Sequence, residues 1–348
     1  MTKVPAYATR GPSDPLGPTT IERRDPRAND VVIDILYCGI CHSDIHQVRN
    51  EWGNSAYPMV PGHEIIGRVA EVGASVRKVA KGELVGVGCL VDACLDCPQC
   101  RAHVEQFCEK GAVLTYNGTE LDRKTPTYGG YSTRIVVRDH FVLKVPTNID
   151  AATAAPLLCA GITTFSPLRQ YGTKAGDRVA VVGLGGLGHM AVKLASSMGA
   201  EVTVLSTSRS KEADARRRGA AAFEPTREEG SFEKLQGRFD LVIDTVSAPH
   251  DYGAYLRTLR PFGTMVLLGI PDTPERVDAM SLIMGNRRLV GSNIGGVAET
   301  QEMLDYCGEH GVTCDIEEIS IGDVNTAYER VLRSDVRYRF VIDIASLR

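Results

Sequence analysis

Four cysteines within fifteen residues give this 348-residue chain its clearest chemical signal. Cys94, Cys97, Cys100 and Cys108 follow the spacing C-x2-C-x2-C-x7-C, with Pro98 inside the group. Four thiolates on so short a loop can enclose one tetrahedral Zn²⁺ and leave no position open for a substrate. The spacing favours a structural zinc over free thiols, disulfides or an iron–sulfur cluster. Loss of that zinc should loosen the loop without removing the chemistry directly.

A second group of possible metal donors is spread over three distant segments. Cys41 follows an apolar run, His63 and Glu64 lie together in the next segment, and Cys159 comes much later. Two thiolates and an imidazole would bind zinc with one coordination position open, which suits a catalytic ion. Spacing alone leaves open the alternative that these are unconnected core or surface residues. Four more cysteines fit neither group and are expected to be ordinary buried or surface thiols: Cys38, Cys89, Cys307 and Cys314.

A glycine-rich turn follows a short apolar strand in the second half of the chain. The strand is Val179–Val182, the turn reads Gly183-Leu184-Gly185-Gly186-Leu187-Gly188, and a helical stretch runs from His189 to Met198. Glycines spaced G-x-G-x-x-G allow a tight turn, a close approach of pyrophosphate, and packing of the helix on the strand. The helix N-terminus then offers donors to the phosphates. The turn therefore predicts a dinucleotide site at residues 183–188.

The end of the following strand bears on which dinucleotide binds. The chain there reads Ser206-Thr207-Ser208-Arg209-Ser210-Lys211, and no carboxylate lies between Glu201 and Glu212. Folds that prefer NAD place an acid at this point to bind the ribose hydroxyls. Hydroxyls with two cations favour a 2′-phosphate instead, and a merely solvated loop would not explain the missing acid. We predict NADP(H), with these contacts: Ser206, Thr207, Ser208, Arg209 and Lys211.

The elements that must position these residues differ between the two halves. The first ~150 residues hold short β-branched runs separated by Gly and Pro, which is typical of a β-rich domain. From about Ala151, strands and helices alternate, as in a parallel doubly wound sheet. After about Gly295, a helix (Val297–His310) and a last strand (Tyr338–Ile344) predict a return to the first domain. The expected fold is α/β, with domains over 1–152 and 153–294 and a return segment over 295–348.

Composition and charge exclude several classes of protein. Hydrophobic residues make up 43% of the chain and charged residues 24%, as in an ordinary globular protein. The net charge of −4 gives no basic field for nucleic acid or an anionic membrane. The most apolar stretch is interrupted by glycines and charges, and the N-terminus has no apolar run of signal-peptide length. We expect a cytosolic protein with reduced thiols and neither nucleic-acid nor membrane partners.

Together these motifs resemble the zinc-containing medium-chain dehydrogenases over nearly the whole chain. The segment 41–46, the triplet Gly62-His63-Glu64, the four-cysteine group and the glycine turn occur in this order in that family. The local sequence is most similar to cinnamyl alcohol dehydrogenases and their bacterial aldehyde-reductase relatives, in segments 41–47, 57–64 and 158–163. The resemblance implies a β-rich GroES-like catalytic domain, a Rossmann cofactor domain, and a homodimer paired near Arg288–Gly295.

The resemblance also implies how the separated donors act. Cys41, His63 and Cys159 would bind a catalytic zinc, with water or substrate oxygen in the fourth position. Glu64 would lie beside the metal and could exchange with the water, so its role as a permanent ligand stays open. Asp44 would be the carboxylate that fixes a ligand histidine.

Further residues take roles by the same resemblance. Ser43 and His46 would carry a proton between substrate oxygen and bulk water, and His42 would lie near the cofactor pyrophosphate. Additional cofactor contacts would be Thr163, Thr245, Gly269, Ser292, Asn293 and Ile294. Candidates for an apolar substrate pocket are Trp52, Met59 and Leu114, each of which could equally be simple packing.

The activity that the resemblance implies is NADP(H)-dependent alcohol dehydrogenation, mainly in the direction of aldehyde reduction, with two zinc ions per chain. Plant cinnamyl enzymes carry a Trp near the position of Leu114, so the sequence favours a broad-range aldehyde reductase over a lignin-monomer enzyme. The alternatives are an NAD-dependent polyol dehydrogenase and a zinc-containing redox sensor or structural protein without turnover. A quinone reductase is disfavoured because those relatives lack the zinc ligands.

Overall fold

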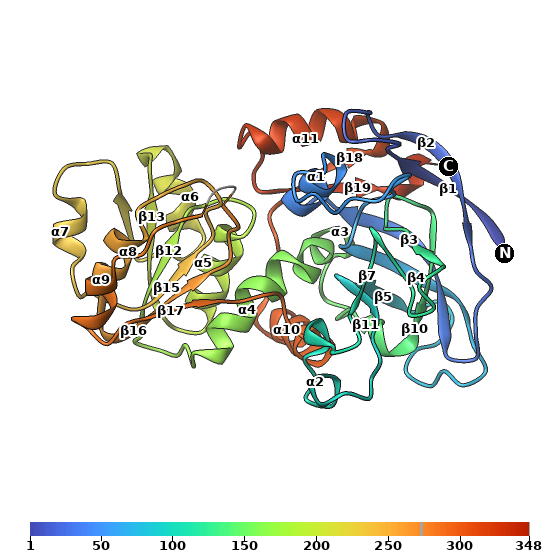
Figure 1. Ribbon diagram of the computed structural model, residues 1–348, viewed down its shortest axis with the longest axis horizontal. Coiled ribbons are helices and arrows are strands. Elements are labelled where there is room, and N and C mark those ends of the chain that lie inside the picture. Colours follow the sequence, from blue (N-terminus) through green and yellow to red (C-terminus); the bar gives the residue numbers. More distant parts are fainter. Residues whose placement is uncertain (272–273, 348) are drawn as a thin grey trace. The chain divides into compact units, whose positions relative to one another are not determined.

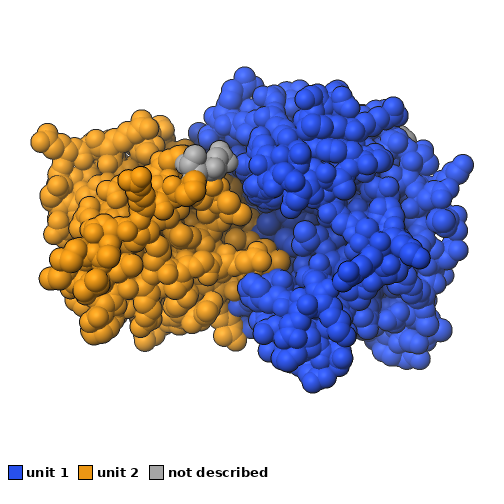
Figure 2. Space-filling view, viewed as in Figure 1, with its two compact units in different colours: residues 1–159, 295–348 blue, residues 160–294 orange. Residues whose placement is uncertain are grey.

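The chain folds into two units, each built around its own β-sheet (Figure 1, Figure 2). One unit consists of residues 1–159 together with 295–348, and the other of residues 160–294. The computed structural model describes residues 1–271 and 274–347, so Arg348, the last residue of the expected return segment, lies outside the described residues. In the described part, no single helix is long and apolar enough to cross a membrane, although one bent pair, Ala151–Leu158 with Ala160–Gln170, passes by length and composition.

The larger unit is organised by a seven-stranded sheet of order β11-β5-β4-β3-β19-β18, in which β10 also pairs with β3. Its strands are β3 (Asp30–Gly39), β4 (Ile65–Val72), β5 (Leu84–Val87), β10 (Arg134–Arg138), β11 (Leu143–Lys144), β18 (Ile316–Ser320) and β19 (Arg339–Asp343). All pairs are antiparallel except β18 with β19. Because β19 pairs with β3, with Val341 opposite Gly39, the end of the chain completes a sheet that its beginning starts.

Short elements surround this sheet. The strands are β1 (Thr2–Ala8), β2 (Gly17–Arg23), β6 (Leu90–Asp92), β7 (Val113–Leu114), β8 (Gly118–Thr119) and β9 (Pro126–Thr127). The helices are α1 (His42–Val48), α2 (Pro98–Arg101), η1 (Glu105–Phe107), η2 (Asp139–Phe141), α3 (Ala151–Ala154), η3 (Ala155–Leu158), α10 (Val297–His310), η5 (Ile321–Asp323), α11 (Val324–Leu332) and η6 (Ile344–Leu347). The helix predicted after Gly295 is therefore present as α10.

The smaller unit is a six-stranded parallel sheet of order β14-β13-β12-β15-β16-β17. Its strands are β12 (Arg178–Val182), β13 (Glu201–Ser206), β14 (Ala222–Pro225), β15 (Phe239–Asp244), β16 (Leu259–Leu267) and β17 (Arg288–Gly291). Its helices are α4 (Ala160–Gln170), α5 (Gly188–Ser197), η4 (Arg209–Lys211), α6 (Glu212–Arg217), α7 (Ser231–Leu235), α8 (Tyr252–Thr258) and α9 (Ala279–Ile283).

The strand order of this sheet is that of a doubly wound dinucleotide fold. The central strand β12 is apolar without alternation because a parallel sheet is covered on both faces, and residues 179–182 are at most 2% exposed. The larger unit is therefore β-rich and the smaller unit is a doubly wound parallel α/β sheet, as the sequence predicted.

Candidate metal and cofactor sites

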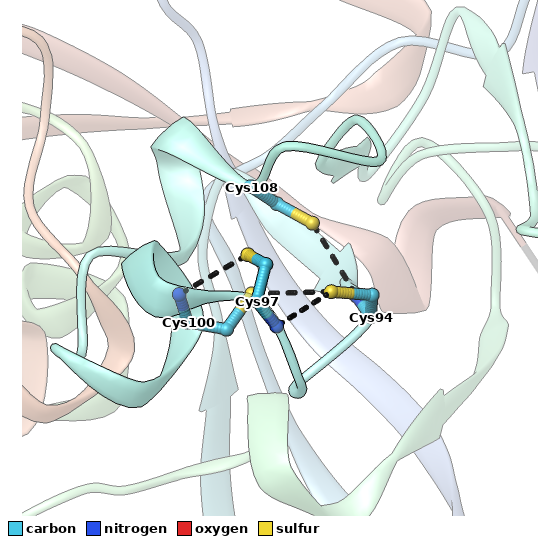
Figure 3. Close-up of side chains that lie close together, drawn as sticks. All are labelled: Cys94, Cys97, Cys100 and Cys108. Carbon is cyan, nitrogen blue, oxygen red and sulfur yellow. Dashed lines mark hydrogen bonds between the residues drawn. The ribbon is translucent and has the colours of Figure 1, made fainter.

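The four-cysteine cluster occupies the loop between β6 and β7 (Figure 3). The sulfur atoms of Cys94, Cys97, Cys100 and Cys108 all lie within 4.8 Å of one another. A tetrahedral ion with Zn–S bonds of about 2.3 Å needs sulfurs about 3.8 Å apart. The Cys94 and Cys100 sulfurs are 3.9 Å apart, so the donor set fits zinc.

Backbone N–H groups of the same loop point at these sulfurs. The N–H of Cys97 lies 3.3 Å from the Cys94 sulfur, and the N–H of Cys100 lies 3.5 Å from the Cys97 sulfur. The Cys100 amide lowers the pKa of Cys97 to about 6. Pro98 begins α2 at a position where a backbone N–H would have no partner within the helix, so its lack of an N–H costs nothing there. The loop therefore favours the thiolate of Cys97, whereas burial raises the pKa of Cys100.

A second cluster, in the interior of the larger unit, brings together donors that are far apart in the sequence. One ligand atom each of Cys41, His63, Glu64 and Cys159 lies within 4.8 Å of the others. The sulfurs of Cys41 and Cys159 are 3.9 Å apart, and all four residues are at most 7% exposed. Cys41 follows β3, His63 and Glu64 precede β4, and Cys159 follows η3, which packs against both strands. Strand pairing therefore assembles this cluster.

Asp44 fixes the geometry around the imidazole of this second cluster. Its fully buried carboxylate accepts hydrogen bonds from the N–H of Cys41 (2.9 Å) and the N–H of Gly62 (3.1 Å). Its Oδ1 also lies 3.1 Å from Nδ1 of His63. Because Asp44 contacts one ring nitrogen, the other is left for a metal ion, and the role that the resemblance implied for Asp44 stays a prediction. The ring of Tyr116 stacks on His63 with centroids 5.9 Å apart.

Glu64 lies between this cluster and a buried arginine that the sequence reasoning missed. Its Oε1 forms an ion pair with Arg339, whereas its Oε2 is buried without a hydrogen-bond partner among the described residues. A Cβ atom on Gly39 would lie 2.0 Å from Oε2, so the carboxylate occupies space that only a glycine leaves free. Burial raises the pKa of Glu64 to about 8, although Arg339 opposes this shift.

An orphaned oxygen beside two sulfurs and an imidazole is a donor set that a cation would satisfy, so the residues fit a metal ion. The sequence did hold one sign of Arg339, because a charged residue directly precedes the apolar segment Phe340–Ile342. A charge buried with that strand requires a buried partner.

The two residues predicted for proton transfer lie in different surroundings. Ser43 Oγ lies 3.7 Å from the Cys41 sulfur, next to the cluster. The Nδ1 atom of His46 hydrogen-bonds to the carboxylate of Glu51, and the His46 ring stacks on Trp52 with centroids 5.1 Å apart. Among the residues that the structure describes, no direct hydrogen bond joins Ser43 to His46. Sequence reasoning missed Glu51, although it follows His46 by five positions.

The three predicted pocket residues differ in exposure, and Trp52 is 37% exposed. Met59 is 2% exposed and exchanges backbone hydrogen bonds with Thr9, whereas Leu114, on β7, is 47% exposed. Their assignment to a substrate pocket stays a prediction.

In the glycine turn of the smaller unit, Gly183 and Gly188 occupy positions where a side chain would clash, and Gly185 faces open space. Gly183 has φ +86°, and a Cβ there would lie 2.8 Å from Val246 Cγ2. A Cβ on Gly188 would lie 2.2 Å from the backbone oxygen of Gly183. Nothing lies within 4 Å of a Cβ on Gly185, so a phosphate could approach the backbone there. Residues 183–188 lead directly into α5, whose N-terminus supplies N–H donors.

The predicted 2′-phosphate contacts follow β13, close to this turn. Lys211 Nζ donates to the backbone oxygen of Leu184 at 3.0 Å, which links η4 to the turn. Arg209 is exposed and forms two parallel hydrogen bonds with Glu228, each of 2.6 Å. The sequence reasoning missed Glu228, for which local spacing gave no signal. Ser208 accepts a hydrogen bond from the N–H of Ser210 at 3.2 Å.

The remaining predicted cofactor contacts lie in the smaller unit, with one exception. They are Thr163 on α4, Ser206 and Thr207 at the end of β13, Thr245 after β15, Gly269 after β16, and Ser292, Asn293 and Ile294 after β17. Those after strands lie at the carboxyl edge of the parallel sheet, where such folds bind ligands. The hydroxyl of Thr245 donates to the backbone oxygen of Val182 at 2.8 Å, just before the turn. His42 is the exception and lies on α1 of the larger unit.

Comparison with known proteins covers both units. A family model described as the alcohol dehydrogenase GroES-like domain matches residues 27–147, and one described as zinc-binding dehydrogenase matches residues 186–309. NADP-dependent alcohol dehydrogenase C of Mycobacterium tuberculosis is 55% identical over 347 residues, covering 100% of both chains. Aldehyde reductase YahK of Escherichia coli is 48% identical over 347 residues, covering 99% of each chain.

A solved structure extends the likeness to three dimensions. Cinnamyl alcohol dehydrogenase SbCAD4 from Sorghum bicolor superposes with a TM-score of 0.96 at 45% identity, covering 99% of this chain and 98% of that one. The likeness spans both sheets and agrees with the motifs read from the sequence. The chain therefore belongs to the zinc-containing medium-chain alcohol dehydrogenase family.

Proposed function

We propose that this chain is an NADP(H)-dependent alcohol dehydrogenase that acts mainly as a broad-range aldehyde reductase, with two zinc ions per chain. The observation that carries the proposal is the convergence of Cys41, His63 and Cys159, with Asp44 holding the imidazole. Three protein donors leave one coordination position, as catalytic zinc sites do. The names of the relatives from M. tuberculosis and E. coli support the cofactor and the direction.

The chain's own residues divide the work of this reaction. When bound, the zinc polarises the carbonyl oxygen as a Lewis acid, and the reduced nicotinamide supplies a hydride. Ser43 Oγ donates a proton to the substrate oxygen, a role that its position beside Cys41 supports. His46 returns a proton to this path, and its partner Glu51 orients the ring. Glu64 has an Oε2 atom without a hydrogen-bond partner in the described structure. This oxygen could take the place of the water molecule at the open coordination position.

The choice of NADP(H) rests on the loop after β13. Arg209 and Lys211 provide two cations, and the hydroxyls of residues 206–208 provide further donors. Glu228 holds the Arg209 guanidinium in a bidentate pair, and a 2′-phosphate would compete with that carboxylate for the same donors. The Arg209 guanidinium is therefore already held with two N–H donors directed at the oxygens of one anion.

A homodimer paired through the smaller unit completes the proposal. Strand β17 ends the six-stranded sheet, and its outer edge has no paired strand among the described residues. Large apolar side chains close to it in sequence are exposed, at 57% for Met280, 66% for Ile283 and 73% for Met284. A second copy that pairs with this edge would cover them, because an open edge with apolar neighbours favours association. We also expect the protein in the cytosol.

Steady-state kinetics with NADPH and NADH test the proposal directly. The substrates are benzaldehyde, cinnamaldehyde and short aliphatic aldehydes, and metal analysis of the same sample counts the zinc ions. We expect aldehyde reduction, a strong preference for NADPH and two zinc ions per chain. A preference for NADH with polyols would support a polyol dehydrogenase. Absence of turnover in fully zinc-loaded protein would support a sensor instead.

The cofactor assignment has its own test. Replacing Arg209 and Lys211 with Ala removes both cations, and because hydrogen bonds to charged groups are worth about 1.5–3 kcal/mol, the preference for NADPH should fall at least about tenfold. The measured quantity is the ratio of kcat/KM for NADPH to that for NADH. Lys193→Ala, on α5, is the matched control. An unchanged ratio in the double variant would refute the 2′-phosphate argument.

A further inference from the structure

A third thiol lies beside the buried metal cluster, although the sequence gave it no role. Cys89 lies between β5 and β6, and its sulfur is 3.8 Å from the backbone oxygen of Leu158, the residue before Cys159. The Cys89 thiol therefore lies against the segment that carries Cys159. The two segments are in close contact, since a Cβ on Gly88 would lie 3.1 Å from the same Leu158 oxygen.

The backbone of Cys89 is held in place from the other side. The N–H of Thr115 donates to the backbone oxygen of Cys89 at 3.1 Å, and the Thr115 hydroxyl donates to the oxygen of Gly88 at 2.5 Å. The fold therefore holds the Cys89 thiol against the backbone of Leu158, the neighbour of Cys159.

Cys89 differs from the sulfurs of the cluster in two respects. Its sulfur is not among the atoms that all lie within 4.8 Å of one another, so a metal held by Cys41, His63 and Cys159 leaves the Cys89 thiol free. It is also partly exposed, whereas Cys41 and Cys159 are each 7% exposed. Oxidation of a thiol follows access and freedom from a metal bond, so of these three sulfurs Cys89 reacts first.

We propose that Cys89 and Cys159 form a reversible disulfide on oxidation, which removes one sulfur donor from the metal centre and switches the site off. The inference rests on the metal centre of the proposed function. Cys38, Cys307 and Cys314 are buried and belong to neither metal cluster, which makes them suitable comparison thiols.

The oxidant is a peroxide, and the step balances in two stages. Hydrogen peroxide transfers one oxygen atom to the Cys89 sulfur, giving a sulfenic acid and one water. The Cys159 sulfur then attacks the Cys89 sulfur, the S–S bond forms, and the sulfenic oxygen leaves as a second water after taking up a proton. Two thiols are oxidised by two electrons in total, and one peroxide is reduced. A dithiol reductant returns both cysteines to thiols by thiol–disulfide exchange, and the reductant itself becomes a disulfide.

Peptide mapping and zinc release test the switch on the full, zinc-loaded chain. The protein is treated with small additions of hydrogen peroxide, its remaining thiols are alkylated, and it is digested without reductant for mass spectrometry. A colorimetric chelator follows zinc in parallel. We expect a Cys89–Cys159 peptide pair, release of one zinc together with loss of aldehyde reduction, and recovery of both after dithiothreitol and added zinc.

Variants separate this pair from the other cysteines. Cys89→Ala, with Cys89→Ser as a second form in case one folds poorly, should slow release of that zinc at least about tenfold, because the reactive partner is gone. Cys314→Ala is the matched control and should behave as the native chain. Disulfides within the four-cysteine loop give peptides other than the Cys89–Cys159 pair, so mass spectrometry tells the two kinds of oxidation apart.

The proposal is overturned if Cys159 pairs with Cys41, if no pair containing Cys159 forms, or if Cys89→Ala releases zinc at the native rate. Absence of zinc from the buried cluster, or of aldehyde reduction, in untreated protein would instead contradict the proposed function. Mapping of the metal-free chain still decides whether Cys89 and Cys159 pair.

Discussion

The two cysteine-containing clusters of this chain depend on the fold to different degrees. The first takes all four donors from residues 94–108, on one loop whose own N–H groups point at the sulfurs (Figure 3). The second takes its donors from three segments and needs the pairing of β3 with β4, the packing of η3, and the buried carboxylate of Asp44. The first is therefore local, and the second is a product of the whole unit.

The difference extends to what each cluster can do. Four sulfurs close a tetrahedron, so an ion there can hold the loop together but cannot take a substrate. Two sulfurs and an imidazole leave a position, and the adjacent Glu64 has an oxygen without a hydrogen-bond partner in the described structure. Loss of the ion should accordingly affect stability in one cluster and chemistry in the other.

Removing a donor from the buried cluster should have the largest effect. In Cys159→Ser, we expect kcat/KM for aldehyde reduction to fall about 10³-fold or more, because Lewis-acid polarisation is worth several kcal/mol. Metal analysis should find one zinc, retained by the four-cysteine cluster. Cys314→Ser, at a buried thiol outside both clusters, should keep two zinc ions and near-native turnover. Turnover at the native level with one zinc would contradict the assignment.

Removing a donor from the four-cysteine cluster should act on stability instead. In Cys97→Ser, we expect loss of that zinc and a fall of about 3 kcal/mol in the free energy of unfolding, because a structural ion contributes folding energy. The melting temperature should fall by roughly 5–10 °C, and kcat/KM of the folded protein should stay within about threefold. Calorimetry and kinetics on the same sample measure both. A loss of turnover without a loss of stability would reverse the roles of the two clusters.

The same contrast explains what the sequence could predict. The loop of residues 94–108 and the glycine turn of residues 183–188 were found from spacing, because in each case local backbone geometry makes the site. The convergence of Cys41, His63 and Cys159 could not be derived from spacing. It depends on strand register, and the resemblance to a family supplied it.

The partners of site residues were harder to predict than the site residues. Arg339 reaches Glu64 from a strand at the other end of the chain, and Glu228 reaches Arg209 across a separate loop. Ion pairs between distant segments leave no periodic pattern in the sequence. A charge at the start of an apolar strand was the one local sign of such a pair. The β-branched runs of the first ~150 residues, in contrast, predicted the β-rich unit, and the later alternation of strands and helices predicted the parallel sheet, because both patterns are local.

A smaller effect should follow when the support of the buried cluster is weakened but its donors are kept. Asp44→Asn retains the shape of the side chain but loses the charge that holds His63 and the N–H groups of Cys41 and Gly62. We expect zinc affinity to fall about 10–100-fold, as is usual for a carboxylate that orients a ligand histidine. Competition with a chelator measures this. Asp92→Asn, outside both clusters, is the control. Native affinity in Asp44→Asn would mean that strand pairing alone positions the imidazole.

The smallest effect is expected where the four-cysteine loop is anchored by a contact other than sulfur. Glu105 is fully buried and accepts hydrogen bonds from His140 Nε2 (2.8 Å) and from the N–H of Val297 (3.0 Å) at the start of α10. Burial raises the pKa of Glu105, but these two hydrogen bonds outweigh it, and the net shift is downward. The stabilisation that ionised Glu105 contributes is therefore complete above the unfolded pKa of about 4.3 and is lost as pH falls through the lower folded value.

Glu105→Gln should lower the free energy of unfolding by about 1–2 kcal/mol at pH 7, and this gap from the native chain should narrow below about pH 4. Denaturant unfolding across this range measures the gap, with the exposed Glu109→Gln as the control. A gap that persists unchanged in acid would show that the packing of Glu105, rather than its charge, joins the loop to α10.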